Sequence, residues 1–267
     1  VDTGMLNFYY KGSGNALVRA GDTVLVYNQA GGDPYDPLPH PRGVGIRPHN
    51  RPADELEALL RSGEVRSTMT DVDTGRTIVE IGDSDHVVRA LFSKRPRRGF
   101  YPDVAAYRLD RLLELDMVPV TVRREVDGKD GSLQFFPPKS MDEGRRAAEG
   151  KGYRATCPLG EQLMAMYIFD VLIFNEGRTR SQMLYDLRDW GLMLIEHGRA
   201  FSTSKGRPRH LVNVPLEFTD GWEAALEALD DDVIAANLSD VLSKRRLQSL
   251  SARRDEILAQ KAAADRR

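Results

Sequence analysis

One segment in the second half of the chain is apolar on almost every side, and it restricts the fold more than any other feature. Residues 161–175 read EQLMAMYIFDVLIFN. A helix at a protein surface keeps one polar face, whereas a helix that is apolar all round is enclosed by other elements. Asp170 interrupts the apolar run, which is also too short to span a bilayer. The sequence therefore predicts a buried helix here, at the centre of a helical lobe.

The chain before this segment reads mostly as β-strands. Strand-like runs separated by turn residues occupy 16–29, 64–82, 86–94 and 117–138. The last of these segments is predicted to form two strands joined by a hairpin that contains Asp-Gly. Amphipathic patterns predict two helices in the same half, at 53–63 and 101–116. After Pro138 the strand patterns give way to helical ones.

This change in composition predicts an α+β chain in three parts. The first is an N-terminal extension at 1–63, with strands, a Pro- and Gly-rich arm and a short helix. The second is a β-rich lobe at 64–138, and the third is a helical lobe at 139–267.

The bulk charge excludes some partners. The 267 residues include 38 basic and 40 acidic side chains, for a net charge of -2, so no global field favours binding to nucleic acid or an anionic membrane.

The lone Cys157 excludes an internal disulfide. Because the chain begins at Val1, a cytoplasmic protein and an exported one that has lost its signal peptide are both open.

Three motifs resemble one branch of the kinase-like proteins. They are DVAAYRLDRLLELDMVPVTV at 103–122, FDVLIFNEGR at 169–178 and LIEHGRAF at 194–201. Together they resemble the Golgi casein kinase and four-jointed family and its bacterial relatives. The resemblance implies a bilobal protein-kinase-like fold, with ATP and Mg²⁺ or Mn²⁺ bound between the lobes. The second and third motifs would be the catalytic loop and the metal loop.

The resemblance assigns nucleotide binding to Lys94 and Asp103. Lys94 ends a strand just before the helix, as the phosphate-binding lysine does in the family. Asp103 stands where the family has the glutamate that orients this lysine. Asp is one methylene shorter, so we expect a strained or water-bridged pair. The alternative for Lys94 is a surface lysine in a basic turn.

The resemblance assigns metal binding to Glu196 and Gln182. Glu196 replaces the metal-binding aspartate, and Gln182 replaces an asparagine. Both keep an oxygen ligand of the kind that Mg²⁺ prefers, extended by one methylene. The alternative for Glu196 is a carboxylate at the end of a strand that pairs with Arg199.

The catalytic aspartate of the family is replaced by Gly177. Glycine cannot accept a proton or orient a hydroxyl group. The neighbouring Glu176 could act as a substitute base. Because it lies one residue earlier in the chain, its side chain points in a different direction from that of the family's aspartate. For Arg178 and His197 we expect structural roles, and for the TDVDTGRT segment at 70–77 a plain hairpin turn rather than a phosphate cradle.

Three functions follow from these residues. The favoured hypothesis is a pseudokinase that acts by binding a nucleotide, a protein partner or both. The second is an active, atypical phosphotransferase or nucleotidyltransferase that uses Glu196 and Gln182 as metal ligands. The third is a pure interaction module. The substrate or partner, the oligomeric state and the role of residues 1–63 do not follow from the sequence.

Overall fold

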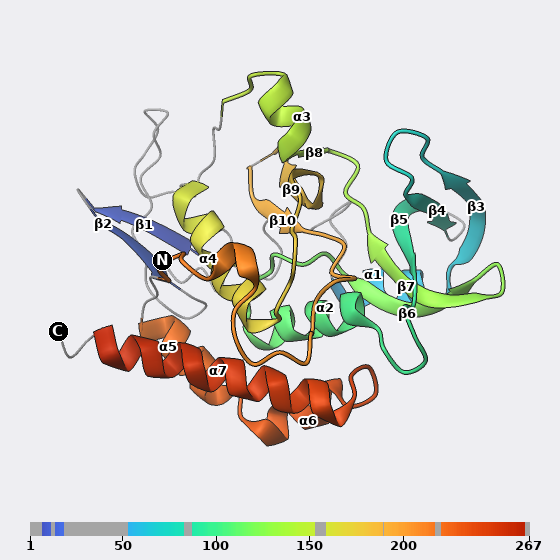
Figure 1. The fold of residues 1–267 in the computed structure, drawn as a ribbon. Coiled ribbons are helices and arrows are strands. Elements are labelled where there is room, and N and C mark those ends of the chain that lie inside the picture. Colours follow the sequence, from blue (N-terminus) through green and yellow to red (C-terminus); the bar gives the residue numbers. More distant parts are fainter. Residues whose placement is uncertain are drawn as a thin grey trace.

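The computed structural model describes residues 7–11, 14–18, 53–82, 87–152, 159–188, 190–216 and 220–264. The Pro- and Gly-rich arm and Cys157 lie outside these residues. The described chain is α+β, with a β-rich N-terminal lobe followed by a helical C-terminal lobe (Figure 1). This confirms the predicted class and the bilobal order expected of a kinase-like fold.

The N-terminal lobe is built on a five-stranded antiparallel sheet with the strand order β3-β4-β5-β7-β6. Its strands are β3 (Glu64–Thr70), β4 (Thr77–Gly82), β5 (Val87–Lys94), β6 (Thr121–Val126) and β7 (Lys129–Phe135). The predicted Asp-Gly turn joins β6 to β7, with positive φ at both Asp127 and Gly128. Val79 and Ile81 of β4 and Val88 and Ala90 of β5 are buried in the main core cluster, so this face of the sheet is covered.

Two helices, α1 (Ala53–Ser62) and α2 (Pro102–Leu112), pack against this sheet. Helix α1 is held to β6 by Arg124, which donates to the carbonyl oxygens of Leu60 at 2.8 Å and Gly63 at 2.7 Å. Pro102 suits the first turn of α2, where no N–H partner is needed. Asp110 of α2 is fully buried and accepts from the backbone of Met117 and Val118, which shapes the turn into β6.

A second, three-stranded antiparallel sheet follows, in the order β10-β9-β8. Its strands are β8 (Ser140–Asp142), β9 (Met183–Asp186) and β10 (Leu192–Leu194). Helix α3 (Glu143–Ala148) begins directly after β8, where the Asp142 carboxylate caps the backbone N–H of Arg145 at 2.9 Å. The short turn η2 (Arg180–Gln182) leads into β9.

Helix α4 (Leu159–Leu172) is the predicted central helix of the C-terminal lobe. Ala165, Ile168, Phe169 and Leu172 are all fully buried, which confirms the prediction. The helical lobe also contains η3 (Arg209–Leu211), α5 (Asp220–Ala228), α6 (Asp231–Leu238) and α7 (Lys244–Ala264). The hairpin of β1 (Asn7–Lys11) and β2 (Gly14–Val18) lies beside α4 and α5.

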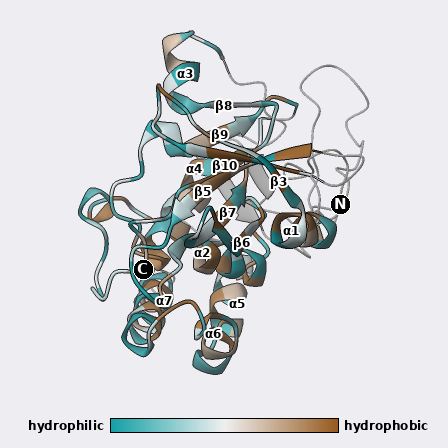
Figure 2. Ribbon diagram, turned by 90° about the vertical axis from the view of Figure 1, so that its right-hand side faces the viewer, coloured by the Kyte–Doolittle hydropathy of each residue, from teal (hydrophilic) through white to brown (hydrophobic). Residues whose placement is uncertain are grey.

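One continuous core joins the two lobes. A single cluster of buried apolar side chains runs from the five-stranded sheet through α2 to α4 and α7. Figure 2 shows hydrophobic stretches gathered toward the middle of the molecule, along β5, β10 and α2. Arg253 of α7 is buried and donates to the carbonyl oxygen of Leu172 at 2.7 Å, so α7 is tied to the end of α4. No helix among the described residues is long and apolar enough to cross a membrane.

Gly131 offers a direct test of the sheet packing. It lies on β7 opposite Lys94, and a Cβ there would overlap the Ser93 carbonyl oxygen and the Phe92 ring. We expect Gly131→Ala to lower the free energy of unfolding by about 1–3 kcal/mol, the usual cost of overpacking. Urea denaturation measures this change. In the control, Gly152→Ala, the added methyl group meets nothing within 4 Å. Equal stability of the two variants would contradict the packing described here.

Candidate functional site

Two loops that are distant in sequence lie side by side at the boundary of the lobes. One follows α4 and spans 173–182, and the other follows β10 and spans 195–201. The backbone N–H of Phe201 donates to the Ile173 carbonyl oxygen at 2.6 Å, and that of Ile195 donates to the Gln182 carbonyl oxygen at 3.1 Å. These are the two segments in which the sequence predicts a catalytic loop and a metal loop.

A buried ion pair holds the first loop in place. Arg178 donates from Nε to Asp170 Oδ2 at 2.5 Å and from Nη2 to Oδ1 at 2.7 Å, and both side chains are almost fully buried. Asn175 donates its side-chain amide to the same carboxylate at 3.0 Å. The Arg178 Nη1 atom reaches the carbonyl oxygens of Gln182 and Ile195, one on each loop. Arg178 therefore has the structural role expected from the sequence.

Gly177 adopts a backbone conformation that disfavours a side chain. Its φ is +84°, in the left-handed region, and an added Cβ would stand 3.1 Å from Arg199 Nη1. The space beside Gly177 therefore faces a guanidinium group rather than a carboxylate. The adjacent Glu176 is exposed to solvent.

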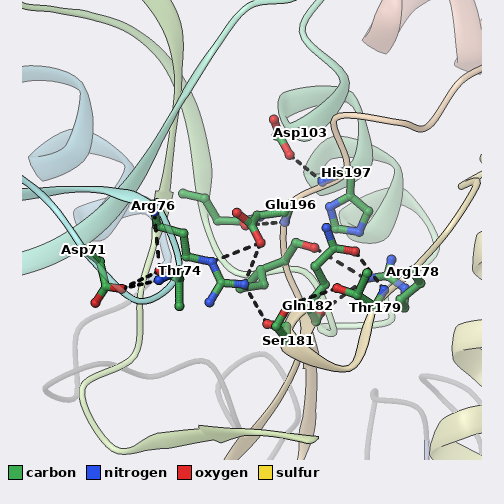
Figure 3. A network of polar contacts seen from close by, with 12 residues as sticks. Asp71, Thr74, Arg76, Asp103, Arg178, Thr179, Ser181, Gln182, Glu196 and His197 are labelled. Carbon is green, nitrogen blue, oxygen red and sulfur yellow. Dashed lines mark hydrogen bonds and ion pairs between the residues drawn. The ribbon is translucent and has the colours of Figure 1, made fainter. Parts of the chain in front are cut away.

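Glu196 is bound by an arginine from the other lobe (Figure 3). Arg76 donates to Glu196 Oε2 from Nη2 at 2.6 Å and from Nε at 3.1 Å. The same Nη2 atom donates to the Ser181 carbonyl oxygen at 2.7 Å. The Arg76 side chain is 11% exposed and that of Glu196 is 28% exposed, so water screens the pair only in part. The sequence suggested Arg199 as the partner of Glu196, but the structure gives Arg76.

The turn between β3 and β4 explains how Arg76 reaches this position. Asp71 accepts from the backbone N–H and the hydroxyl of Thr74, both at 2.7 Å, and Gly75 takes a positive φ. The hydrogen bond from the Thr74 hydroxyl is the main reason why the pKa of Asp71 lies below its usual value. The segment is thus a hairpin turn, as expected, and it directs Arg76 toward the loops of the helical lobe (Figure 3).

Gln182 uses its side-chain oxygen within its own turn. Gln182 Oε1 accepts from the backbone N–H of Thr179 at 3.1 Å, which caps η2. The two oxygens proposed as metal ligands are therefore bound to a guanidinium group and to a backbone amide. Among the described residues, no group of three or more His, Cys, Asp or Glu side chains could hold a metal. In this arrangement Glu196 and Gln182 do not form a site that fits Mg²⁺ or Mn²⁺.

Asp103 ties α2 to the second loop. Its side chain is 4% exposed, and Oδ1 accepts from the backbone N–H of His197 at 2.6 Å, while Oδ2 accepts from Ser132 Oγ at 3.2 Å. Burial raises the pKa of this carboxyl group, and these hydrogen bonds oppose the shift. Lys94 is exposed at the end of β5, and within the described residues no ion pair joins it to Asp103. The structure thus brings Asp103 to the loop of Glu196 without pairing it with Lys94.

His197 differs from the expectation of a satisfied structural histidine. The imidazole is fully buried, and neither ring nitrogen has a hydrogen-bond partner among the described residues. It packs edge-on against Phe169, with the ring centroids 6.2 Å apart. Burial, and secondly the charge of Arg178, hold its pKa well below the ordinary value of 6.5. His197 is therefore neutral in the folded protein near pH 7.

The contact between Arg76 and Glu196 was not predictable from the motifs. It joins positions that are 120 residues apart, and a lone arginine in a hairpin turn has no distinguishing pattern. Asp170 did carry a signal, because a carboxylate within an apolar helix requires a buried partner.

The chain has limited similarity to known proteins. No protein-family model matches the chain, and no curated protein matches it significantly. Among solved structures, the chain is similar to the Helicobacter pylori proinflammatory kinase CtkA, with 12% sequence identity and a TM-score of 0.47. The similarity covers 77% of this chain and 98% of that one. Similarity of this extent does not establish an activity, so the function proposed below rests on this protein's own residues.

The buried His197 predicts a specific pH dependence. As the pH falls below about 6.5, the unfolded chain takes up a proton on this side chain that the folded chain does not. Its contribution to stability is therefore complete above that pH and is lost below it, by up to about 1.4 kcal/mol per pH unit. We expect His197→Phe to remove this part of the dependence.

Urea denaturation at a series of pH values between about 4.5 and 7.5 measures the effect, as the difference between variant and wild type. Taking the difference cancels the contributions of other groups, such as Asp103. The control is His210→Asn at an exposed histidine. If wild type and His197→Phe lose stability in parallel below pH 6.5, the neutral state of His197 is wrong.

Proposed function

We propose that this protein is a pseudokinase: a kinase-like protein that lacks phosphoryl transfer and acts by binding a nucleotide, a protein partner or both. The observation that carries the proposal is the ion pair between Arg76 and Glu196. Through this pair, Arg76 places its positive charge at Glu196, the residue that the resemblance assigns to metal binding.

The strength of this pair supports the proposal. Arg76 makes two charge-assisted hydrogen bonds to Glu196 and a third hydrogen bond to Ser181. A hydrogen bond to a charged group contributes about 1.5–3 kcal/mol, and every 1.4 kcal/mol changes an equilibrium about tenfold. A metal ion that displaces Arg76 therefore binds at least about tenfold more weakly than at a free carboxylate.

The surroundings of Gly177 support the same proposal. Phosphoryl transfer needs a group that orients or deprotonates the acceptor hydroxyl. Gly177 has no such group, and the space beside it faces Arg199. The exposed Glu176 is one residue away, on a loop held rigidly by Arg178 and Asp170. Because the loop is fixed, the Glu176 carboxylate cannot move into the position beside Gly177.

The second function is an active, atypical phosphotransferase or nucleotidyltransferase. The observation that favours it is that the loops of Glu196 and Gln182 lie side by side, with one backbone hydrogen bond of 3.1 Å between them. This function requires Arg76 to leave Glu196 and Gln182 to leave its cap. Lys94 and Asp103 would then contribute to nucleotide binding.

The Arg76 side chain provides the main test. We expect Arg76→Gln to lower the free energy of unfolding by about 1–3 kcal/mol, because it leaves a partly buried carboxylate unpaired. The matched control is Arg89→Gln, which breaks the more exposed ion pair with Glu80 and costs about 0–1 kcal/mol. We also expect Mn²⁺ to raise the melting temperature of Arg76→Gln but not that of the wild type or of Arg76→Gln/Glu196→Ala.

Labelled nucleotides separate the two functions. With Mg²⁺ or Mn²⁺ present, we expect no incorporation of ³²P from γ-labelled or α-labelled ATP into the wild-type protein or a generic acceptor. Incorporation of the γ-label that Glu196→Ala abolishes would show phosphotransfer and would contradict the proposal. Incorporation of the α-label would show nucleotidyl transfer. If ATP also gives no thermal shift, with or without a metal ion, binding is confined to a protein partner.

A further inference from the structure

A cavity lined by arginine residues lies beside the candidate site. Its volume is about 800 Å³, and its walls come from three parts of the chain. These are the turn before α2 (within residues 97–100), the end of the loop of Glu196 with the residues that follow it (within 198–203), and the start of α7 with the residue before it (within 243–246). Glu176 also contributes to the wall, so the cavity borders the first loop of the site.

The charges of this wall are strongly unbalanced. Five arginines line it and Glu176 is the one carboxylate among the described lining residues; the arginines are Arg97, Arg98, Arg199, Arg245 and Arg246. Among the described residues, no ion pair joins any of the five to a carboxylate. The protein as a whole has a net charge of only -2, so the positive charge is local to the cavity.

One of the arginine side chains is held in place by the surrounding structure. Arg246 stacks over the Phe100 ring, with its guanidinium carbon 4.0 Å from the ring centroid, and donates to the Phe201 carbonyl oxygen. The backbone of Arg97 forms a β-bridge with Phe100 across a tight turn in which Gly99 takes a positive φ, which fixes the position of its Cα atom. The Arg246 guanidinium group is thus preorganised, which lowers the entropy cost of binding a ligand there.

The positions of these charges are unfavourable without an anion. Burial, and secondly the charge of Arg97, lower the pKa of Arg246. Lys244, Arg245 and Arg246 occupy the first turn of α7, where the helix dipole already gives a positive potential. An anion in the cavity would relieve both the mutual repulsion of the arginines and this clash with the dipole.

We propose that this cavity binds a compact anion that carries two or more phosphoryl groups, held by Arg97, Arg245 and Arg246. Arginine forks bind phosphate oxygens in bidentate geometry, and three or more of them match the charge of a polyphosphate better than that of a single carboxylate. The volume lies in the range of small-molecule sites. A long nucleic acid requires an extended basic surface, which the small net charge does not support.

This inference does not depend on the absence of phosphoryl transfer. A polyphosphate in the cavity would join the turn before α2, the loop of Glu196 and the start of α7. It would therefore stabilise the boundary between the lobes, whether or not ATP is turned over. The chemistry is shared by free polyphosphates and by the phosphate chain of a nucleotide, and the choice of probes separates these two sources.

The test is isothermal titration calorimetry of the full chain with sodium tripolyphosphate, in 150 mM salt with EDTA. We expect saturable binding at least about tenfold tighter than that of orthophosphate, because more arginines are engaged. Arg97→Gln and Arg245→Gln should each weaken the binding about tenfold. Both side chains are exposed, so these variants keep the buried core intact.

The matched control is Arg145→Gln on α3, an exposed arginine far from the start of α7 (Figure 1). It should bind tripolyphosphate as the wild type does. No binding by the wild type, or equal weakening in Arg145→Gln, would overturn the proposal. Tighter binding of ATP than of tripolyphosphate, lost in Arg245→Gln, would identify a nucleotide as the source. Equal binding would identify the phosphate chain alone.

Discussion

The buried ion pair between Asp170 and Arg178 is the interaction on which the site depends. A carboxylate at the end of an apolar helix is costly to bury, and the bidentate guanidinium group together with the Asn175 amide satisfies it. Arg178 then has one nitrogen left, which reaches the carbonyl oxygens of Gln182 and Ile195. A single charged side chain therefore joins α4, the loop after it and the loop after β10. Removing either member would leave an unpaired charge in the core.

Around this centre, three polar side chains are bound by the protein's own residues. Asp103 accepts from the backbone of His197, Glu196 is paired with Arg76, and Gln182 caps its own turn. The first two contacts join α2 and the turn between β3 and β4 to the loop of Glu196, and so link the two lobes. The arginine-lined cavity is the contrasting case, because its positive charges are paired with no carboxylate among the described residues.

Much of the fold followed from local patterns. The 3.6-residue period predicted α2, the Asp-Gly turn predicted the hairpin of β6 and β7, and the all-round apolar segment predicted α4 as the central helix. Each of these signals depends on residues close together in sequence. The pairing of Lys94 with Asp103, by contrast, was inferred from the family alone, and in this structure Asp103 contacts Ser132 and His197 instead. A resemblance in sequence motifs does not specify the hydrogen-bond partner of each side chain.

The sequence by itself determined the α+β class and the order of the lobes, because periodicity and residue identity are local properties. Only the tertiary structure decided what Glu196 does. Arg76 lies 120 positions away and reaches Glu196 because the turn between β3 and β4 lies beside the loops of Ser181 and Glu196 (Figure 3). The arginines of the cavity likewise come from separate segments and meet only when α2 and α7 pack in the same core. Electrostatic interactions depend on distance in space, and a sequence pattern does not specify that distance.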